Sequence, residues 1–185
     1  KDEFVNDYLQ LIDAFRKVNP ACKIWICRLT PITAKHPRFE SGTRDWYWQI
    51  QHQIEEIAGV AGVSIIDLQE GLYARPDLLP DALHPTVEGA SIIARTVYSS
   101  LTGNFGGLKM SSLFTDGMVL QCNEPLRITG TSNAGDQITV SVGGQKKRTV
   151  TSSNGKWSVV LDPLKAGGPY ELSVSGANKR YVYKD

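Results

Sequence analysis

Residues 63–101, VSIIDLQEGLYARPDLLPDALHPTVEGASIIARTVYSSL, contain the clearest structural signals in the first part of the chain. This stretch opens with six residues rich in β-branched side chains, which are typical of a strand buried in a parallel sheet. A proline-rich loop follows, up to Pro85. Apolar residues then recur at helical spacing over residues 87–101, with Thr86 in front as the expected N-cap. The stretch therefore predicts a strand, a loop and a helix in that order.

The same alternation extends back to the start of the chain. Helical spacing of apolar residues predicts an amphipathic helix over residues 2–18. A second β-rich run, KIWICR, occupies residues 23–28, and another helix follows from about residue 46 to 62. Alternating helices and strands indicate an α/β arrangement with a parallel sheet. Because two strands cannot bury both faces of such a sheet, we expect residues 1–103 to be the end of a larger domain.

Composition changes near residue 104. Residues 1–103 hold 10 basic and 13 acidic side chains, whereas residues 104–185 hold 10 basic and 6 acidic ones. The glycine-containing run at 104–108 is the expected linker. Residues 109–185 form short alternating runs separated by turn signals, which predict a small antiparallel sandwich of about seven strands with Trp157 facing its core. Asn154-Gly155, between two such runs, is the strongest signal for a hairpin.

The balance of charges excludes several classes of partner. With 20 basic and 19 acidic side chains the net charge is +1, so we expect neither nucleic acid nor a membrane as a partner. No apolar run is long enough to span a bilayer. Cys22, Cys27 and Cys122 have no metal-ligand spacing, and we expect them to be buried free thiols. We expect no metal and no organic cofactor.

The candidate for chemistry is the pair Asp81 and His84, spaced Asp-x-x-His where a loop opens a helix. A histidine base needs a partner that fixes its tautomer, and an aspartate three residues earlier in a tight turn can reach the ring. The carboxyl edge of a parallel sheet is also where α/β active sites form. From the residues alone, a histidine that caps the helix or fills a loop pocket stays an equal alternative.

Three further residues are candidates for binding substrate. Trp46 and Trp48 flank a tyrosine on the second helix, and since neighbouring helical residues point in different directions, not all three can be buried. One tryptophan could stack on a sugar, or one or two could pack against the sheet. Arg28, at a strand end, could contact substrate or pair with a carboxylate. Both alternatives stay open.

The block DLQEGLYARPDLLPDALHPTVEGASIIA, residues 67–94, resembles the last sequence block of the SGNH (GDSL-type) esterases and lipases. The helix over 2–18 and the run KIWICRLTPI resemble the carbohydrate O-acetylesterase branch of that family. The resemblance covers residues 1–103 and implies the C-terminal portion of a flavodoxin-like three-layer fold. It also implies that Asp81 orients His84, and that His84 activates a serine within a Ser-His-Asp triad.

The serine of that triad is missing from the chain. The family places it in a Gly-Asp-Ser block, and its oxyanion glycine and asparagine lie in two later blocks, all upstream of the helix over 2–18. No Gly-Asp-Ser or Gly-x-Ser-x-Gly motif occurs in the sequence. We therefore expect the nucleophile to lie outside these 185 residues and the chain alone to be inactive.

The second part has its own resemblance. SLFTDGMVLQ at 112–121, NGKW at 154–157 and KAGGPY at 165–170 resemble the β-sandwich of bacterial sialate O-acetylesterase-like proteins. In that family a second SGNH domain follows the sandwich. The two resemblances imply a hydrolase of acetylated carbohydrates, such as polysaccharide or sialic acid esters, secreted or periplasmic. The alternative is a non-catalytic sandwich that acts as a spacer or binds carbohydrate.

Overall fold

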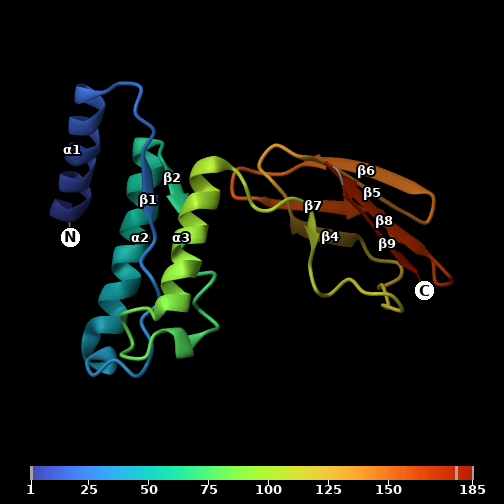
Figure 1. Ribbon diagram of the computed structural model, residues 1–185, viewed down its shortest axis with the longest axis horizontal. Helices are drawn as coiled ribbons and strands as arrows, with labels where there is room; N and C mark the ends of the chain where they lie inside the picture. The colour runs from blue at the N-terminus through green and yellow to red at the C-terminus, as the bar shows by residue number, and fades with distance from the viewer. Residues whose placement is uncertain (1, 178, 185) are drawn as a thin grey trace. The chain divides into compact units, whose positions relative to one another are not determined.

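The computed structural model describes residues 2–177 and 179–184, and the chain divides into two compact units, Lys1–Val97 and Tyr98–Asp185 (Figure 1). The first unit is α/β and the second is all β, which confirms both predicted fold classes. The linker predicted at 104–108 follows directly after the third helix, α3, and its role as a domain boundary stays a prediction.

The first unit alternates helices and strands in the predicted order. Its elements are α1 (Asp2–Val18), β1 (Trp25–Cys27), a short π-helical turn (Phe39–Thr43), α2 (Arg44–Ala61), β2 (Ser64–Ile66), a 3-10 turn (Pro76–Leu78) and the greater part of α3 (Val87–Thr102), which continues past the unit boundary at Val97. The two strands are parallel and pair over three residues, Trp25 opposite Ser64 to Cys27 opposite Ile66. Both strands are shorter than the β-rich runs in the sequence.

Helices α1 and α2 pack on one face of this two-stranded sheet. The buried cluster joins Ile12 of α1, Ile26 of β1 and Ile57 of α2. Gly62 ends α2 in the left-handed conformation, where its N–H reaches the carbonyl of Ala58. At the start of α3 the Thr86 hydroxyl accepts the N–H of Gly89 at 3.2 Å, which confirms the predicted N-cap.

The expectation that the cysteines are buried thiols is wrong. Cys27 and Cys122 are exposed and Cys22 is half-buried. Successive residues of a strand face opposite sides of the sheet. Ile26 points to the helical core, so Cys27 points to the other face and is exposed there. A β-rich run predicts a strand, but it does not show how many of the strand's faces are covered.

The second unit is a sandwich of two antiparallel sheets. One sheet has the order β3-β4-β7, and the other has the order β6-β5-β8-β9. The strands are β3 (Lys109–Met110), β4 (Leu126–Thr131), β5 (Gln137–Val142), β6 (Gln145–Val150), β7 (Lys156–Leu161), β8 (Glu171–Gly176) and β9 (Lys179–Lys184). These seven described strands confirm the predicted sandwich.

The core of the sandwich is built from alternating residues of both sheets. Ile128 on β4, Val140 on β5 and Leu161 on β7 are fully buried, as is Val174 on β8. Trp157 is 3% exposed, so its predicted place in the core is confirmed. Burial of such sets of apolar side chains supplies most of the folding energy of a small sandwich.

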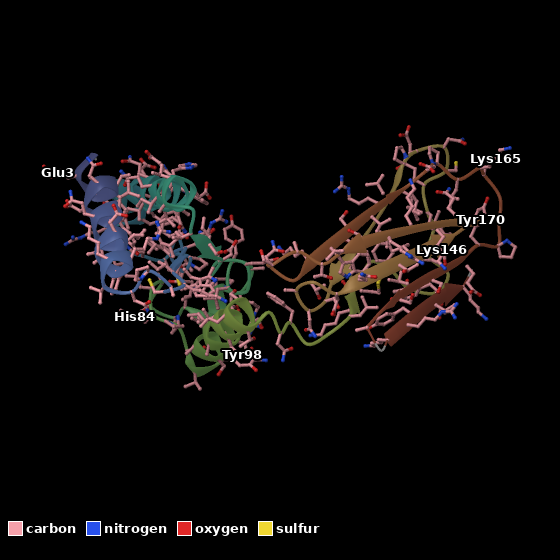
Figure 2. All side chains as sticks on the ribbon, turned by 90° about the horizontal axis from the view of Figure 1, so that it is seen from above. Glu3, His84, Tyr98, Lys146, Lys165 and Tyr170 are labelled. Carbon is pink, nitrogen blue, oxygen red and sulfur yellow. The ribbon has the colours of Figure 1, made fainter. Side chains whose placement is uncertain are left out.

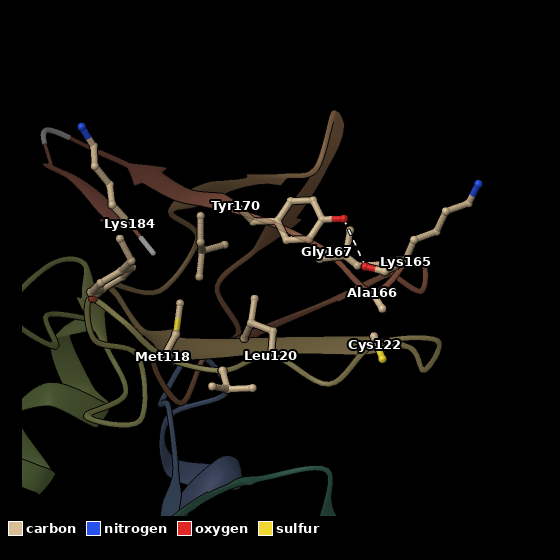
Figure 3. A pocket seen from close by; sticks show the side chains of 12 residues that line it. Met118, Leu120, Cys122, Lys165, Ala166, Gly167, Tyr170 and Lys184 are labelled. Atoms are coloured by element: carbon tan, nitrogen blue, oxygen red, sulfur yellow. Dashed lines mark hydrogen bonds between the residues drawn. The ribbon is translucent and has the colours of Figure 1, made fainter.

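The extended segment before β4 lies beside the core. Met118 and Leu120 pack against the buried cluster, and with Tyr170 they line a cavity of about 190 Å³ (Figure 3). The Tyr170 hydroxyl donates to the carbonyl of Lys165 at 3.1 Å. The segment and the loop before β8 therefore line the same cavity.

The hairpin predicted at Asn154-Gly155 is wrong. The strand before it, β6, pairs with β5, whereas the strand after it, β7, pairs with β4 in the other sheet. The turn therefore carries the chain from one sheet to the other. Gly155 has φ +76°, as a tight turn with glycine requires, so the predicted turn is present although the two strands it joins do not pair with each other. A local turn signal cannot show which strands pair across the sandwich.

Candidate active site

The turn that joins the 3-10 turn to α3 brings Asp81 and His84 together. One carboxylate oxygen of Asp81, Oδ1, accepts the backbone N–H of Leu83 at 3.0 Å and that of His84 at 2.7 Å. The other oxygen, Oδ2, lies 2.7 Å from Nδ1 of the His84 ring. The aspartate thus binds the backbone of the turn and the imidazole at once, as the spacing in the sequence predicts. Figure 2 labels His84 within the first unit.

These hydrogen bonds set the charge and the tautomer of the pair. The backbone N–H of His84, followed by its imidazole and the N–H of Leu83, lowers the pKa of Asp81 from 3.8 to about 2. The carboxylate is therefore ionised at neutral pH and can only accept hydrogen bonds. The neutral ring must then carry its hydrogen on Nδ1, which leaves the lone pair of Nε2 free to take a proton.

The backbone beneath the pair is anchored in the interior. Ala82 is 0% exposed and has φ +71°, a left-handed conformation that a non-glycine residue rarely adopts. Its N–H donates to the carbonyl of Leu79 at 2.9 Å, and its carbonyl accepts the N–H of Thr33 at 3.3 Å. In contrast, the side chain of His84 is 82% exposed. The turn therefore presents an oriented imidazole on a fixed backbone.

Arg28 lies at the end of β1 and is held by two carboxylates. Its Nη1 is 3.0 Å from Oδ2 of Asp67, and its Nη2 is 2.6 Å from Oε1 of Glu55. Asp67 also accepts the backbone N–H of Gln69, so the ion pair is tied to the loop after β2. Of the two roles left open by the sequence, the carboxylate pair is present; a contact with substrate stays a prediction.

The aromatic residues of α2 divide as the helical geometry requires. Trp46 is 64% exposed and Trp48 is 45% exposed, while Tyr47 between them is 6% exposed. Both tryptophans are therefore accessible for stacking. Their role in binding substrate stays a prediction, and no hydrogen bond or ion pair described here joins them to Asp81 or His84.

Sequence reasoning missed a buried amide that fixes the loop after β1. Gln51 is 4% exposed, and its amide accepts the N–H of Leu29 and donates to the carbonyl of the same residue, each at 3.2 Å. It also donates to the Tyr47 hydroxyl at 2.9 Å, which in turn accepts from Gln69. A glutamine in the middle of a helix gives no signal in the sequence, because only the fold shows that its side chain points inward.

Within residues 2–177 and 179–184, no group of three or more acidic, histidine or cysteine side chains has the arrangement of a metal site. Over the same residues, every helix is too short or too polar to cross a lipid bilayer.

Residues 1–92, which include Asp81 and His84, match the model of the GDSL-like lipase/acylhydrolase family. This part of the chain is therefore similar to that family. Among solved structures, a carbohydrate acetylesterase from Xanthomonas citri is similar at 33% sequence identity, with a TM-score of 0.41. The match covers 42% of this chain and 18% of that protein, so it spans less than a fifth of the other chain. Comparison with curated proteins gives no match.

Proposed function

We propose that this chain is a segment of an esterase that removes O-acetyl groups from carbohydrates. Asp81 orients His84, and the nucleophilic serine lies outside these 185 residues. The observation that carries the proposal is the 2.7 Å contact between Asp81 and Nδ1 of an exposed imidazole, within a stretch of the GDSL-like family. The choice of carbohydrate rests on the resemblance of residues 1–103 to the O-acetylesterase branch, and two exposed tryptophans on α2 suit a sugar.

In the proposed reaction, Nε2 of His84 takes the proton of the serine hydroxyl as the serine oxygen attacks the acetyl carbonyl. The imidazolium that forms is stabilised by the ionised Asp81. His84 then gives the proton to the sugar oxygen as the ester bond breaks, which leaves an acetyl-serine. Water, activated by the same imidazole, attacks the acetyl-serine and releases acetate. The residues of this chain supply the proton transfer and its orientation, and the reaction as proposed uses neither metal nor cofactor.

The proposal also covers the sandwich, the linker and the location of the protein. The sandwich is the entry module of a second SGNH domain that continues beyond this chain, with residues 104–108 as the linker between the two domains. Acetylated polysaccharide or sialic acid esters are found outside the cytoplasm, which places the protein in a secreted or periplasmic setting.

The test is hydrolysis of an acetylated oligosaccharide by the part of the protein that runs from the proposed serine through residue 185, without the proposed second SGNH domain. His84→Ala should lower kcat by about a thousandfold or more, because the members of a triad act as a unit. His52→Ala, at an exposed position on α2, is the matched control and should leave kcat unchanged. Unchanged turnover by the His84 variant would overturn the assignment of the base.

The 185-residue chain alone sharpens this test. It should give no turnover of an activated acetyl ester, because it lacks the nucleophile. Turnover that disappears on His84→Ala would place the nucleophile within this chain and contradict the proposal of an external serine.

A further inference from the structure

The outward face of the four-stranded sheet β6-β5-β8-β9 has a distinct chemistry. Because side chains alternate along a strand, Ile138 and Val140 of β5 enter the core and Thr139 and Ser141 face outward. The middle outward positions of the central strands β5 and β8 thus carry short hydroxyl side chains, among them Ser175, while Gln137 and Glu171 occupy the outward positions at the strand ends. The middle of the outward surface of this sheet therefore consists of small polar side chains.

Cationic side chains lie on the two edge strands, on either side of these hydroxyl side chains. Arg148 on β6 is opposite Thr139, which is opposite Ser175, which is opposite Arg180 on β9. This row spans three inter-strand spacings of about 4.8 Å, or about 14 Å. Lys146, two residues from Arg148 on the same strand, adds a second charge at the β6 edge and is labelled in Figure 2. We use the name cationic face for the surface formed by Lys146, Arg148, Arg180 and the outward hydroxyl side chains of β5 and β8.

The positive charge of the cationic face is not neutralised by the residues around it. All three cations are exposed, and none makes an ion pair within the described part of the chain. Arg180 instead donates from Nε to the hydroxyl of Ser173 at 2.9 Å, which holds its guanidinium next to the hydroxyl side chains of β8. The neighbouring Lys147 points to the other side of the sheet, where it pairs with Asp162. Glu171 is acidic and lies on this face, but its register partner is Lys184.

We propose that the cationic face binds a linear, carboxylate-bearing polysaccharide. Charge complementarity selects an anionic partner, and the second part of the chain as a whole carries more basic than acidic groups. Short hydroxyls let an extended polymer approach the sheet and exchange hydrogen bonds with sugar hydroxyls. The choice of a polysaccharide among anionic polymers rests on the proposed function of the chain.

The side chains on this face argue against other anionic surfaces. Trp157 is buried, and Tyr181 and Tyr183 pack toward the core, so the described part of the face offers no ring on which a base could stack. The outward apolar residues, Val150 and Val182, are too short to anchor in a lipid bilayer. Binding by charge and hydroxyls, without aromatic stacking, distinguishes this surface from a sugar platform built on tryptophan.

Such binding would keep an acidic substrate at high local concentration near the esterase to which the sandwich is tethered. The expected result is retention on the polymer independent of ester hydrolysis. The esterase activity of the complete protein should therefore be higher on acetylated acidic polymers than on small acetyl esters.

Affinity of the 185-residue chain for polygalacturonate, measured by titration calorimetry at low salt, tests the proposal. Binding should be present and should weaken as salt is added, because exposed charges are screened. Replacing the three cations, Lys146→Gln, Arg148→Gln and Arg180→Gln, should weaken binding by about 10- to 30-fold, since each exposed charge contact contributes about threefold. The fully methyl-esterified polymer, which has the same linkage without the charge, should not bind.

A control variant with the same change in net charge separates this face from a general effect of charge. Lys109→Gln, Arg127→Gln and Lys165→Gln lie outside the cationic face and should leave affinity within about twofold of the unmodified chain. Equal loss in both variants, no binding at all, or tighter binding of a single-stranded oligonucleotide would overturn the proposal. The assay needs no turnover, so its failure is distinguishable from failure of the proposed esterase function.

Discussion

The second unit closes its core between two sheets, and twelve residues of both sheets and their loops form one buried cluster. The first unit packs two helices on one face of a two-stranded sheet, and its main cluster has five residues. Along α1, Leu11 is 50% exposed and Phe15 is 58% exposed, although Phe15 lies only three residues from the buried Ile12 on the same side of the helix. The sandwich therefore closes one large core from its own strands and loops, whereas the α/β unit leaves large apolar side chains of α1 exposed beside a smaller cluster.

The largest expected effect follows from separating the two regions. Residues 103–185, expressed alone, should give a dispersed NMR spectrum and one cooperative unfolding transition, because the sandwich core is complete within them. Residues 1–102 alone should bind the dye ANS and unfold without a sharp transition, because their apolar surface stays open. A cooperative first segment that does not bind ANS would break the comparison.

The same substitution placed in the two units should have unequal costs. Leu161→Ala removes a fully buried side chain from β7 and should lower the free energy of unfolding of the sandwich by about 2–5 kcal/mol. Leu11→Ala changes a half-exposed position on α1 and should cost about 1 kcal/mol or less. Urea unfolding of each variant measures both values, and similar costs would contradict the difference in core closure.

A smaller effect separates the two kinds of turn within the sandwich. Gly155, in the turn that crosses between sheets, has φ +76°, and a Cβ there would collide with the ring of Phe105. Gly144, in the hairpin between β5 and β6, has φ +78° with open space around its Cβ position. Gly155→Ala should therefore cost about 2–3 kcal/mol, of which the left-handed backbone accounts for about 1 kcal/mol.

Gly144→Ala is the matched control, because it carries the backbone cost alone, about 1 kcal/mol. Thermal unfolding of the two variants measures the difference. Equal losses at both positions would mean that Phe105 moves aside without cost and that the crossing turn is no tighter than the hairpin.

Much of the fold could be predicted because its signals are local. Helical spacing gave α1, α2 and α3, and the position of Thr86 before an apolar run gave the cap of α3. The Asp-x-x-His spacing predicted the contact between Asp81 and His84 for the same reason, since four residues of one turn determine it.

What could not be predicted depends on residues distant in the sequence. The pairing of β6 with β5 and of β7 with β4 is decided by the whole sandwich, so the signal at Asn154-Gly155 led to the wrong hairpin. The exposure of Cys27 depends on which elements cover the sheet. The role of Gln51 depends on a loop carbonyl 22 residues away in the sequence.

The smallest expected effect is a local one at the candidate site. The pKa of Asp81 is lowered from 3.8 to about 2, so its hydrogen bonds contribute fully above about pH 4 and are lost as the pH falls through 2. Carbon-13 NMR of the carboxyl group and the amide shifts of Leu83 and His84, followed from pH 5 to 1.5, should report this titration. The carboxylate is exposed, so the change should stay within the turn and leave the unfolding of the sandwich unaltered.

His84→Ala sharpens the assignment of that shift. The backbone N–H of residue 84 is the largest cause of the lowered pKa and survives the substitution, whereas the imidazole contact is removed. The pKa of Asp81 should therefore rise only part of the way and stay below 3.8. A full return to 3.8 would mean that the ring, not the turn, holds the carboxylate. In that case the backbone hydrogen bonds of Ala82 would still position His84, but Asp81 would be held in place by the imidazole and not by the backbone of the turn.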